Sequence, residues 1–148
     1  KLKNQIQDAK LKGANIIRGG DILDNSTLQN GYFFPPTILT NVKNDMLIYK
    51  QETFGPIAPI IIYEDTAEVI NMANDTDYGL AAYIYTNNIS VALNAMEMLN
   101  FAIIGINDVN PTSASIPFGG IGNSGIGREG GAMGIEEYLE NKSVGIRI

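Results

Sequence analysis

The 148-residue chain contains no cysteine and no histidine. Their absence excludes a thiolate nucleophile, a disulfide, a Cys/His zinc site and a Ser-His-Asp triad within these residues. The side chains that remain for chemistry are carboxylates, amides, hydroxyls and a few cations. No metal site is therefore expected.

Basic residues are also scarce. Ten Lys and Arg stand against 16 Asp and Glu, which gives a net charge of −6, and the basic residues are scattered along the chain. Neither nucleic acid nor an anionic membrane surface is thus an expected partner. The longest apolar runs, such as residues 57–62, are too short to span a bilayer. The N-terminal residues lack the apolar stretch of a signal peptide, so a cytoplasmic location is expected.

The composition is typical of a soluble globular domain, with 45% hydrophobic and 18% charged residues. A chain of this length can bury roughly two thirds of its unfolded surface. We therefore expect one domain with a core of its own.

The first third of the chain predicts mixed elements. Apolar positions at helical spacing predict a helix over residues 3–12 that Gly13 ends. Because this helix starts without a cap, we expect something to precede it in a parent protein. A short strand at residues 15–18 and a polar loop at residues 24–31 follow. Two consecutive prolines confine residues 32–39 to an edge strand or an extended segment.

From residue 57 the pattern alternates between strand and helix. The apolar run of residues 57–63 predicts a strand that is covered on both faces. Two further strands are expected at residues 80–86 and 101–107, with helices that begin at Asp65 and Asn88. Strands joined by single helices favour one parallel sheet with right-handed crossovers.

The last third begins with a long loop, residues 108–127, rich in Pro, Ser, Thr and Gly. A loop of this length usually has a function, and ligands bind where loops leave the carboxyl ends of parallel strands. A helix is expected over residues 129–140. Alternating apolar residues predict a terminal strand over residues 143–148, whose apolar face a partner chain would cover.

The segment QETFGP, residues 51–56, is a candidate binding segment. The ring of Phe54 could offer a flat apolar face to a planar ring, and the carboxylate of Glu52 could accept hydrogen bonds from the two hydroxyls of a ribose. The alternative is an exposed Glu and a packed Phe beside a Gly-Pro turn, and spacing alone favours it.

A second candidate is PFGG at residues 117–120. Phe118 could form the wall of a substrate pocket, and Asn107 could point an amide toward the same crevice or merely satisfy backbone groups. Arg128 and Glu129 favour a structural ion pair or a helix cap. The pattern G-x-G-x-x-G occurs twice nearby, but a loop precedes it rather than a strand, so a dinucleotide-binding loop is rejected.

The motifs taken together, in order, resemble the aldehyde dehydrogenase superfamily over nearly the whole chain. They are GYFFPPTIL, E-x-F-G-P, NDTDYGLAAYIYT, PFGG, SGIGREGG and EEYLENKSV. The resemblance implies an α/β fold: the three-layer parallel-sheet core of the catalytic domain, truncated, with a terminal oligomerisation strand. Residues 1–140 would be the C-terminal part of the catalytic domain. Residues 141–148 would be the strand through which a homo-oligomer forms.

The resemblance also implies roles for single residues. Glu52 matches the carboxylate that binds the nicotinamide ribose of NAD or NADP, and Phe54 the aromatic residue that positions the nicotinamide. Phe118 matches a wall of the aldehyde tunnel, and Asn107 a position beside it. In the succinate-semialdehyde branch, which the last two motifs resemble, a loop hydroxyl can hold the far carboxylate of the small aldehyde. The candidates are Thr112, Ser113 and Ser115.

Those hydroxyls are equally well ordinary loop groups, and lactaldehyde, glyceraldehyde or another hydroxyaldehyde would suit the loop as well. Family members oxidise an aldehyde to its acid with a cysteine nucleophile, an oxyanion-binding Asn and a Glu that activates water. These residues and the coenzyme domain are expected upstream of Lys1, so no catalytic residue is assigned here and the chain alone should be inactive. Two alternatives are a free-standing binding or assembly module and a nucleotide binder in its own right.

Overall fold

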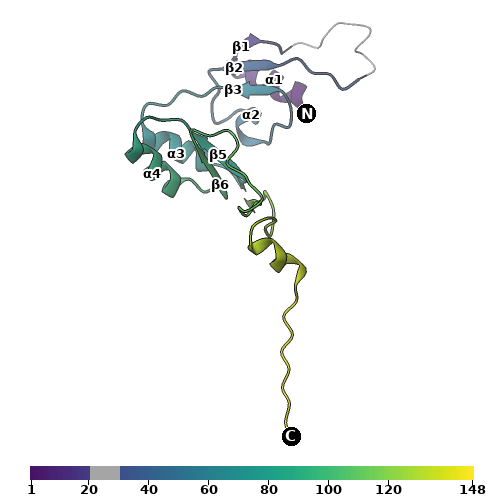
Figure 1. The fold of residues 1–148 in the computed structure, drawn as a ribbon. Coiled ribbons are helices and arrows are strands. Elements are labelled where there is room, and N and C mark those ends of the chain that lie inside the picture. Colours follow the sequence, from purple (N-terminus) through teal and green to yellow (C-terminus); the bar gives the residue numbers. More distant parts are fainter. Residues whose placement is uncertain (21–30) are drawn as a thin grey trace. The chain divides into compact units, whose positions relative to one another are not determined.

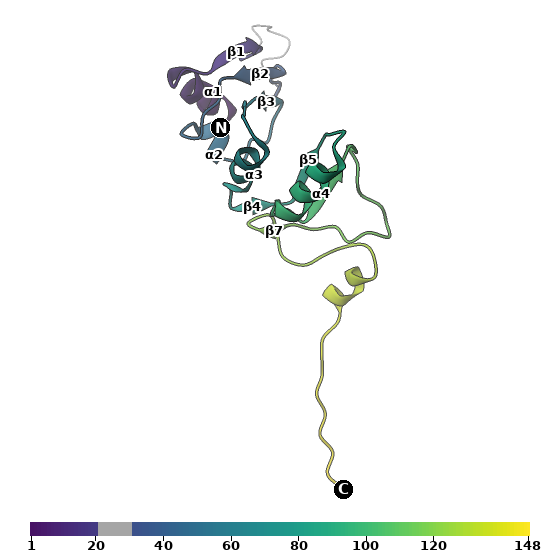
Figure 2. The same ribbon diagram turned by 90° about the vertical axis from the view of Figure 1, so that its left-hand side faces the viewer.

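The computed structural model describes residues 1–20 and 31–148. The polar loop predicted at residues 24–31 lies outside them, except for Gly31. The chain divides into two compact units, Lys1–Tyr63 and Glu64–Ile148, and each is described by itself. Figures 1 and 2 show their elements. The separate division that the resemblance implies at residue 140 stays a prediction.

The first unit is a three-stranded sheet with two helices. Its elements are α1 (Leu2–Leu11), β1 (Asn15–Arg18), β2 (Thr37–Thr40), α2 (Leu47–Lys50) and β3 (Ile57–Pro59). The strand order is β1-β2-β3, with β2 antiparallel to β1 and parallel to β3 (Figure 1). The helix predicted at residues 3–12 is confirmed. It begins without a side-chain cap and is followed by Gly13, whose φ of 93° favours glycine.

Strand β2 is the central strand of this sheet, so the prediction of an edge strand or extended segment at residues 32–39 was wrong for its second half. The two prolines precede β2 and therefore remove no donor from it. The first residue after them, Thr37, already donates its N–H to the carbonyl of Pro56 at 2.8 Å. The prolines restrict only the entry to the strand.

Strand β3 is shorter and more exposed than predicted. It ends at Pro59 and lies at the edge of the sheet, next to β2 alone. Ile60 and Ile62, inside the predicted strand, are 45% and 84% exposed. The prediction of a strand covered on both faces was therefore wrong for this chain. Proline at position 59 accounts for the short strand, because it cannot donate to a ladder.

The core of the first unit lies between α1, α2 and the sheet. Side chains from both helices, the central strand and the turn after it form one buried cluster. Its members are Ile6, Ala9, Ala14, Leu39, Val42, Met46 and Ile48. Leu39 and Met46 are completely buried. This packing fixes α1 and α2, and with them the start of segment 51–56.

The second unit contains two small sheets and two α-helices. Its elements are α3 (Thr66–Asn74), β4 (Tyr78–Gly79), β5 (Ala81–Ile84), α4 (Ile89–Met98), β6 (Ile103–Ile106), β7 (Ile121–Gly122) and the 3₁₀-helix η1 (Met133–Tyr138). β5 pairs with β6 in parallel, and β4 with β7 antiparallel. Helices α3 and α4 lie side by side (Figures 1 and 2). Both predicted helix starts are confirmed: Asp65 accepts from the N–H of Glu68, and Asn88 from those of Ser90 and Val91.

The mixed α/β class is confirmed, but the predicted single parallel sheet is not what the described residues form. β5 and β6 are parallel neighbours, as expected, whereas β3 belongs to another sheet. The physical reason is that β2 offers β3 a parallel partner, with the N–H of Ile60 reaching the carbonyl of Leu39 at 2.8 Å. Hydrophobic pattern alone does not say which strand pairs with which.

One prediction for the C-terminal residues was also wrong, and a second one stays a prediction. The helix expected at residues 129–140 is a six-residue 3₁₀-helix, because Gly130 and Gly131 take positive φ angles of 72° and 56° and Gly134 weakens the remainder. Residues 141–148 form no strand and are all exposed. A β-ladder needs a neighbouring strand, and within the described part of the chain these residues have none, so the oligomerisation strand expected at a partner chain stays a prediction.

Candidate functional site

Segment 51–56 is held by the first unit at its beginning, middle and end. The N–H of Gln51 donates to the carbonyl of Leu47 at the end of α2, at 2.9 Å. The side-chain Nε2 of Gln5, in α1, donates to the carbonyl of Glu52 at 3.3 Å. The carbonyl of Pro56 accepts from Thr37 in β2. The backbone of the segment therefore has a defined course across the end of the sheet.

Between these anchors, Glu52 and Phe54 point their side chains into solvent. The Phe54 ring is 86% exposed, so the alternative of a packed Phe does not hold in this chain. The Glu52 carboxylate lies 3.6 Å from the ammonium of Lys1, and both side chains are about half exposed. An exposed pair of this kind is weak and leaves the carboxylate able to accept other hydrogen bonds.

The glycine of this segment lies against the Leu2 side chain of α1. A Cβ at Gly55 would lie 2.5 Å from Cδ1 of Leu2, inside van der Waals contact. A larger residue at position 55 would require the flexible Leu2 side chain to move.

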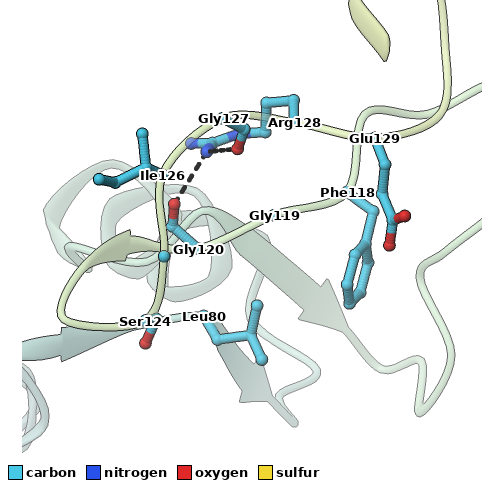
Figure 3. Close-up of a pocket in the computed structure, with 10 residues that line it drawn as sticks. Leu80, Phe118, Gly119, Gly120, Ser124, Ile126, Gly127, Arg128 and Glu129 are labelled. Atoms are coloured by element: carbon cyan, nitrogen blue, oxygen red, sulfur yellow. Dashed lines mark hydrogen bonds between the residues drawn. The ribbon is translucent and has the colours of Figure 1, made fainter. Parts of the chain in front are cut away.

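In the second unit, a glycine-rich turn presents Phe118 (Figure 3). The N–H of Phe118 donates to the carbonyl of Glu129 at 2.7 Å, and the N–H of Glu129 donates back at 2.8 Å. This two-way bridge closes residues 118–129 into a loop. The ring of Phe118 is 38% exposed and borders a hollow of about 360 Å³, which Leu80, Ser124, Ile126, Arg128 and the loop glycines also line.

Arg128 ties this loop together. Its Nη1 donates to the carbonyls of Gly120 at 2.8 Å and Gly127 at 2.7 Å, the two dashed lines in Figure 3. Its backbone N–H donates to Oε1 of Glu137 in η1. Arg128 therefore has a structural role, as predicted, but its partners are carbonyls and not the carboxylate of Glu129. Glu129 contributes its backbone to the bridge with Phe118.

The three candidate hydroxyls differ in how their protons are used. The Thr112 hydroxyl donates to Oδ1 of Asn110 at 2.8 Å. Ser113 and Ser115 bring their Oγ atoms within 3.0 Å of each other, and both residues are exposed. One hydroxyl of a pair donates to the other, so the pair keeps one O–H for a third group. The serines can thus donate to an anion without breaking a bond, and Thr112 cannot.

Asn107 directly follows β6, as predicted, and its amide is engaged by a neighbouring strand end. Its Oδ1 accepts from the N–H of Thr86 at 3.0 Å, and its Nδ2 donates to the carbonyl of the same residue at 2.9 Å. The φ of Asn107 is 54°, in the left-handed region that Asn tolerates better than most residues. The structure thus shows the backbone-satisfying role, which links the ends of β5 and β6.

Two supporting residues were missed by sequence reasoning. Gln5 is 1% exposed and reaches Glu52. Asp8 accepts from the N–H of Leu47 at 2.7 Å and pairs with Lys12 at 2.9 Å, so it caps α2 from α1. The Leu47 hydrogen bond and Lys12 lower the pKa of the Asp8 carboxyl. For Gln5, the available sequence signal was a polar residue at a helix position that faces the core. No sequence signal pointed to Asp8.

Residues 1–20 and 31–148 contain no cluster of three acidic side chains suited to a metal ion. None of the helices described is both long and apolar enough to cross a membrane.

The chain is mixed α/β, with E-x-F-G-P after α2 and PFGG in a closed glycine loop. The aldehyde dehydrogenase family model matches residues 1–144. The chain belongs to the aldehyde dehydrogenase family.

Named relatives and a solved structure agree with this assignment. The chain is 43% identical to a glutarate-semialdehyde dehydrogenase of Pseudomonas putida over 148 residues, 100% of the chain and 30% of the relative. It is 42% identical to the NADP(+) succinate-semialdehyde dehydrogenase 2 of Schizosaccharomyces pombe, over 99% of the chain and 29% of that protein.

Among solved structures, a betaine aldehyde dehydrogenase variant from Staphylococcus aureus in complex with NAD+ matches with a TM-score of 0.87 and 39% identity. The match covers 95% of this chain and 29% of that one. The chain therefore spans about three tenths of the length of these proteins.

Proposed function

We propose that these residues form the C-terminal part of the catalytic domain of an NAD(P)-dependent aldehyde dehydrogenase. In this proposal the longer protein oxidises a small semialdehyde to its acid. The observation that carries the proposal is segment 51–56: a family motif whose backbone is fixed by three elements while a carboxylate and an aromatic ring are left in solvent.

Glu52 and Phe54 fit the nicotinamide end of the coenzyme. A carboxylate accepts hydrogen bonds from two neighbouring ribose hydroxyls, and the 86% exposed ring offers an apolar face to a flat heterocycle. When bound, the coenzyme accepts the hydride that leaves the substrate. The chain's own task is to hold the ribose, with Lys1 giving up its weak contact to Glu52.

Loop 108–129 fits the substrate. The half-exposed Phe118 ring supplies an apolar wall, and its position is set by the bridge to Glu129 and by Arg128. The Ser113–Ser115 pair supplies the spare O–H for a carboxylate at the far end of the substrate, a feature that succinate and glutarate semialdehydes share. The geometry favours these serines over Thr112, whose proton is already used, and gives Asn107 a supporting role.

The chain alone should be inactive, because it has no cysteine to attack the aldehyde. We place the nucleophile, the oxyanion-binding Asn and the base in the remainder of the longer protein. Residues 141–148 then serve as the oligomerisation strand: Val144 and Ile146 are 71% and 81% exposed and would be covered by a second copy. Light scattering of the full-length protein showing a monomer that is unchanged by deleting these residues would reject that last part.

The coenzyme role is tested with Glu52→Gln in the full-length protein. The neutral amide keeps the size of the side chain but loses charge-assisted acceptance, which is worth about 1.5–3 kcal/mol. We expect the dissociation constant for NAD(P) to rise about tenfold to a hundredfold. Glu64→Gln, at an exposed position in the second unit, is the matched control. Equal coenzyme binding by the wild-type protein and both variants would reject the proposal.

A further inference from the structure

Gln5 is a polar residue in an apolar core. It belongs to α1, directly precedes the core residue Ile6, and is 1% exposed. Burying an amide costs free energy unless it forms hydrogen bonds. An apolar residue of similar volume would fill this place without that cost, so the amide needs a reason beyond packing.

The Gln5 amide forms a hydrogen bond with the backbone of Glu52. Its Nε2 donates to the Glu52 carbonyl at 3.3 Å. The opposite orientation of the amide would place one carbonyl-type oxygen against another, so the partner settles which end faces Glu52. The other end, Oε1, is buried without a hydrogen-bond partner among the described residues. The same is true of Oγ1 of Thr53, the residue after Glu52. The contact to Glu52 is therefore made at a real cost in polar satisfaction.

The same helix holds the approach to the segment. Asp8, one turn beyond Gln5 on the same face of α1, accepts from the N–H of Leu47 at the start of α2. Helix α2 then leads within a few residues to Glu52. Two side chains of α1 thus fix both ends of the stretch from residue 47 to residue 52.

We propose that Gln5 is a positioning residue that sets the direction of the Glu52 carboxylate. It touches neither substrate nor coenzyme, and it acts by fixing the Glu52 peptide from which the carboxylate projects. The inference rests on the proposed function for the claim that this carboxylate meets a ribose, but the fixing of the peptide is a property of the chain itself.

The test begins with hydrogen exchange of the chain without coenzyme. Gln5→Met keeps the length of the side chain and removes the donor. The backbone amide of Gln51, which precedes Glu52 and donates to the carbonyl of Leu47 at 2.9 Å, should exchange about threefold to tenfold faster, the range for one net hydrogen bond. The amide of Leu39 in the core serves as the reference for overall opening, and its rate should stay unchanged. Gln7→Met, on the exposed side of the same helix, is the matched control and should change neither rate.

A second variant keeps the proposal testable if Gln5→Met folds poorly. Gln5→Glu can donate to the Glu52 carbonyl only when its carboxyl group is protonated. After correction for intrinsic exchange, the Gln51 amide of this variant should exchange fast at neutral pH and more slowly on acidification. Neither the wild-type chain nor Gln5→Met should show this slowing. An exchange rate of the Gln51 amide that stays at the wild-type value in these variants, or that rises no more than that of Leu39, would overturn the proposal.

The coenzyme arm uses the full-length protein and equilibrium titration with NADPH or NADH. Gln5→Met should weaken binding about threefold to tenfold, in step with the exchange rate. Loosened exchange with unchanged binding would overturn the role of Gln5 in directing the carboxylate. Unchanged binding by Glu52→Gln as well would locate the failure in the proposed function, because the peptide would then be fixed for a side chain that binds no coenzyme.

Discussion

The two units present their candidate residues by different means. In Lys1–Tyr63, a closed core of seven apolar side chains carries α1, α2 and the sheet, and segment 51–56 is attached to these rigid elements. In Glu64–Ile148, the buried apolar side chains among the described residues are Ile70, Ala92 and Ala95. Its loop 108–129 is held by bonds within itself and by the pairing of β7 with β4.

The difference shows where each candidate segment draws its stability. Segment 51–56 depends on the core of the first unit. Loop 108–129 depends on Arg128, the Phe118 bridge and the pairing of β7 with β4. Large side chains of its unit, such as Tyr83, Ile89 and Leu93, remain about half exposed or more. We attribute the cover for those side chains to the remainder of the longer protein.

The largest effect is expected in the core of the first unit. Leu39→Ala empties space around a fully buried side chain of the central strand and should lower the free energy of unfolding by about 2–5 kcal/mol. Leu11→Ala makes the same change at a 78% exposed position and should cost less than about 0.5 kcal/mol. Urea unfolding curves measure both. Equal midpoints would contradict the description of this unit as a closed core.

The next effect concerns the loop of the second unit. Arg128→Met keeps a long side chain but removes the donors to two carbonyls, so the loop should open more easily by about 2 kcal/mol. Limited proteolysis should cut within residues 119–127 of this variant, while the wild-type chain stays intact there. The matched control is Arg147→Met in the exposed C-terminal residues. If the loop is equally resistant in all three proteins, Arg128 does not hold it.

The smallest effect is a pH dependence in the first unit. The pKa of Asp8 is lowered in the folded chain by the Leu47 N–H and then by Lys12. Because the folded state favours the ionised carboxyl, this group stabilises the fold above the unfolded pKa of about 3.9 and loses that contribution as the pH falls through its folded pKa. Asp8→Asn should therefore flatten the acid limb of stability against pH below about pH 4. An acid limb identical to that of the wild-type chain would show that the cap on α2 adds nothing.

Sequence patterns predicted local features well and pairing poorly. The sequence correctly predicted the helix ends that a single residue determines, because caps and glycine act within one turn. These residues are Gly13, Asp65 and Asn88. The partner of β3 and the exposure of Ile62 were not, because they depend on which distant strand is available. The terminal strand likewise needs a neighbour that a single chain does not specify.

The candidate site divides in the same way. Motifs located Glu52, Phe54 and Phe118, and the structure adds what periodicity does not encode: the exposure of the Phe54 ring, the Ser113–Ser115 pair and the use of the Asn107 amide on Thr86. Gln5 lay outside every motif, since its role depends on a contact 47 residues away.

A crystal structure of the full-length protein with bound NAD(P) tests the central claim most directly. The account predicts the Glu52 carboxylate within about 3.2 Å of a hydroxyl of the nicotinamide ribose, with the Phe54 ring beside the nicotinamide. A bound coenzyme whose ribose is held by other groups, while Glu52 remains paired with Lys1, would contradict it.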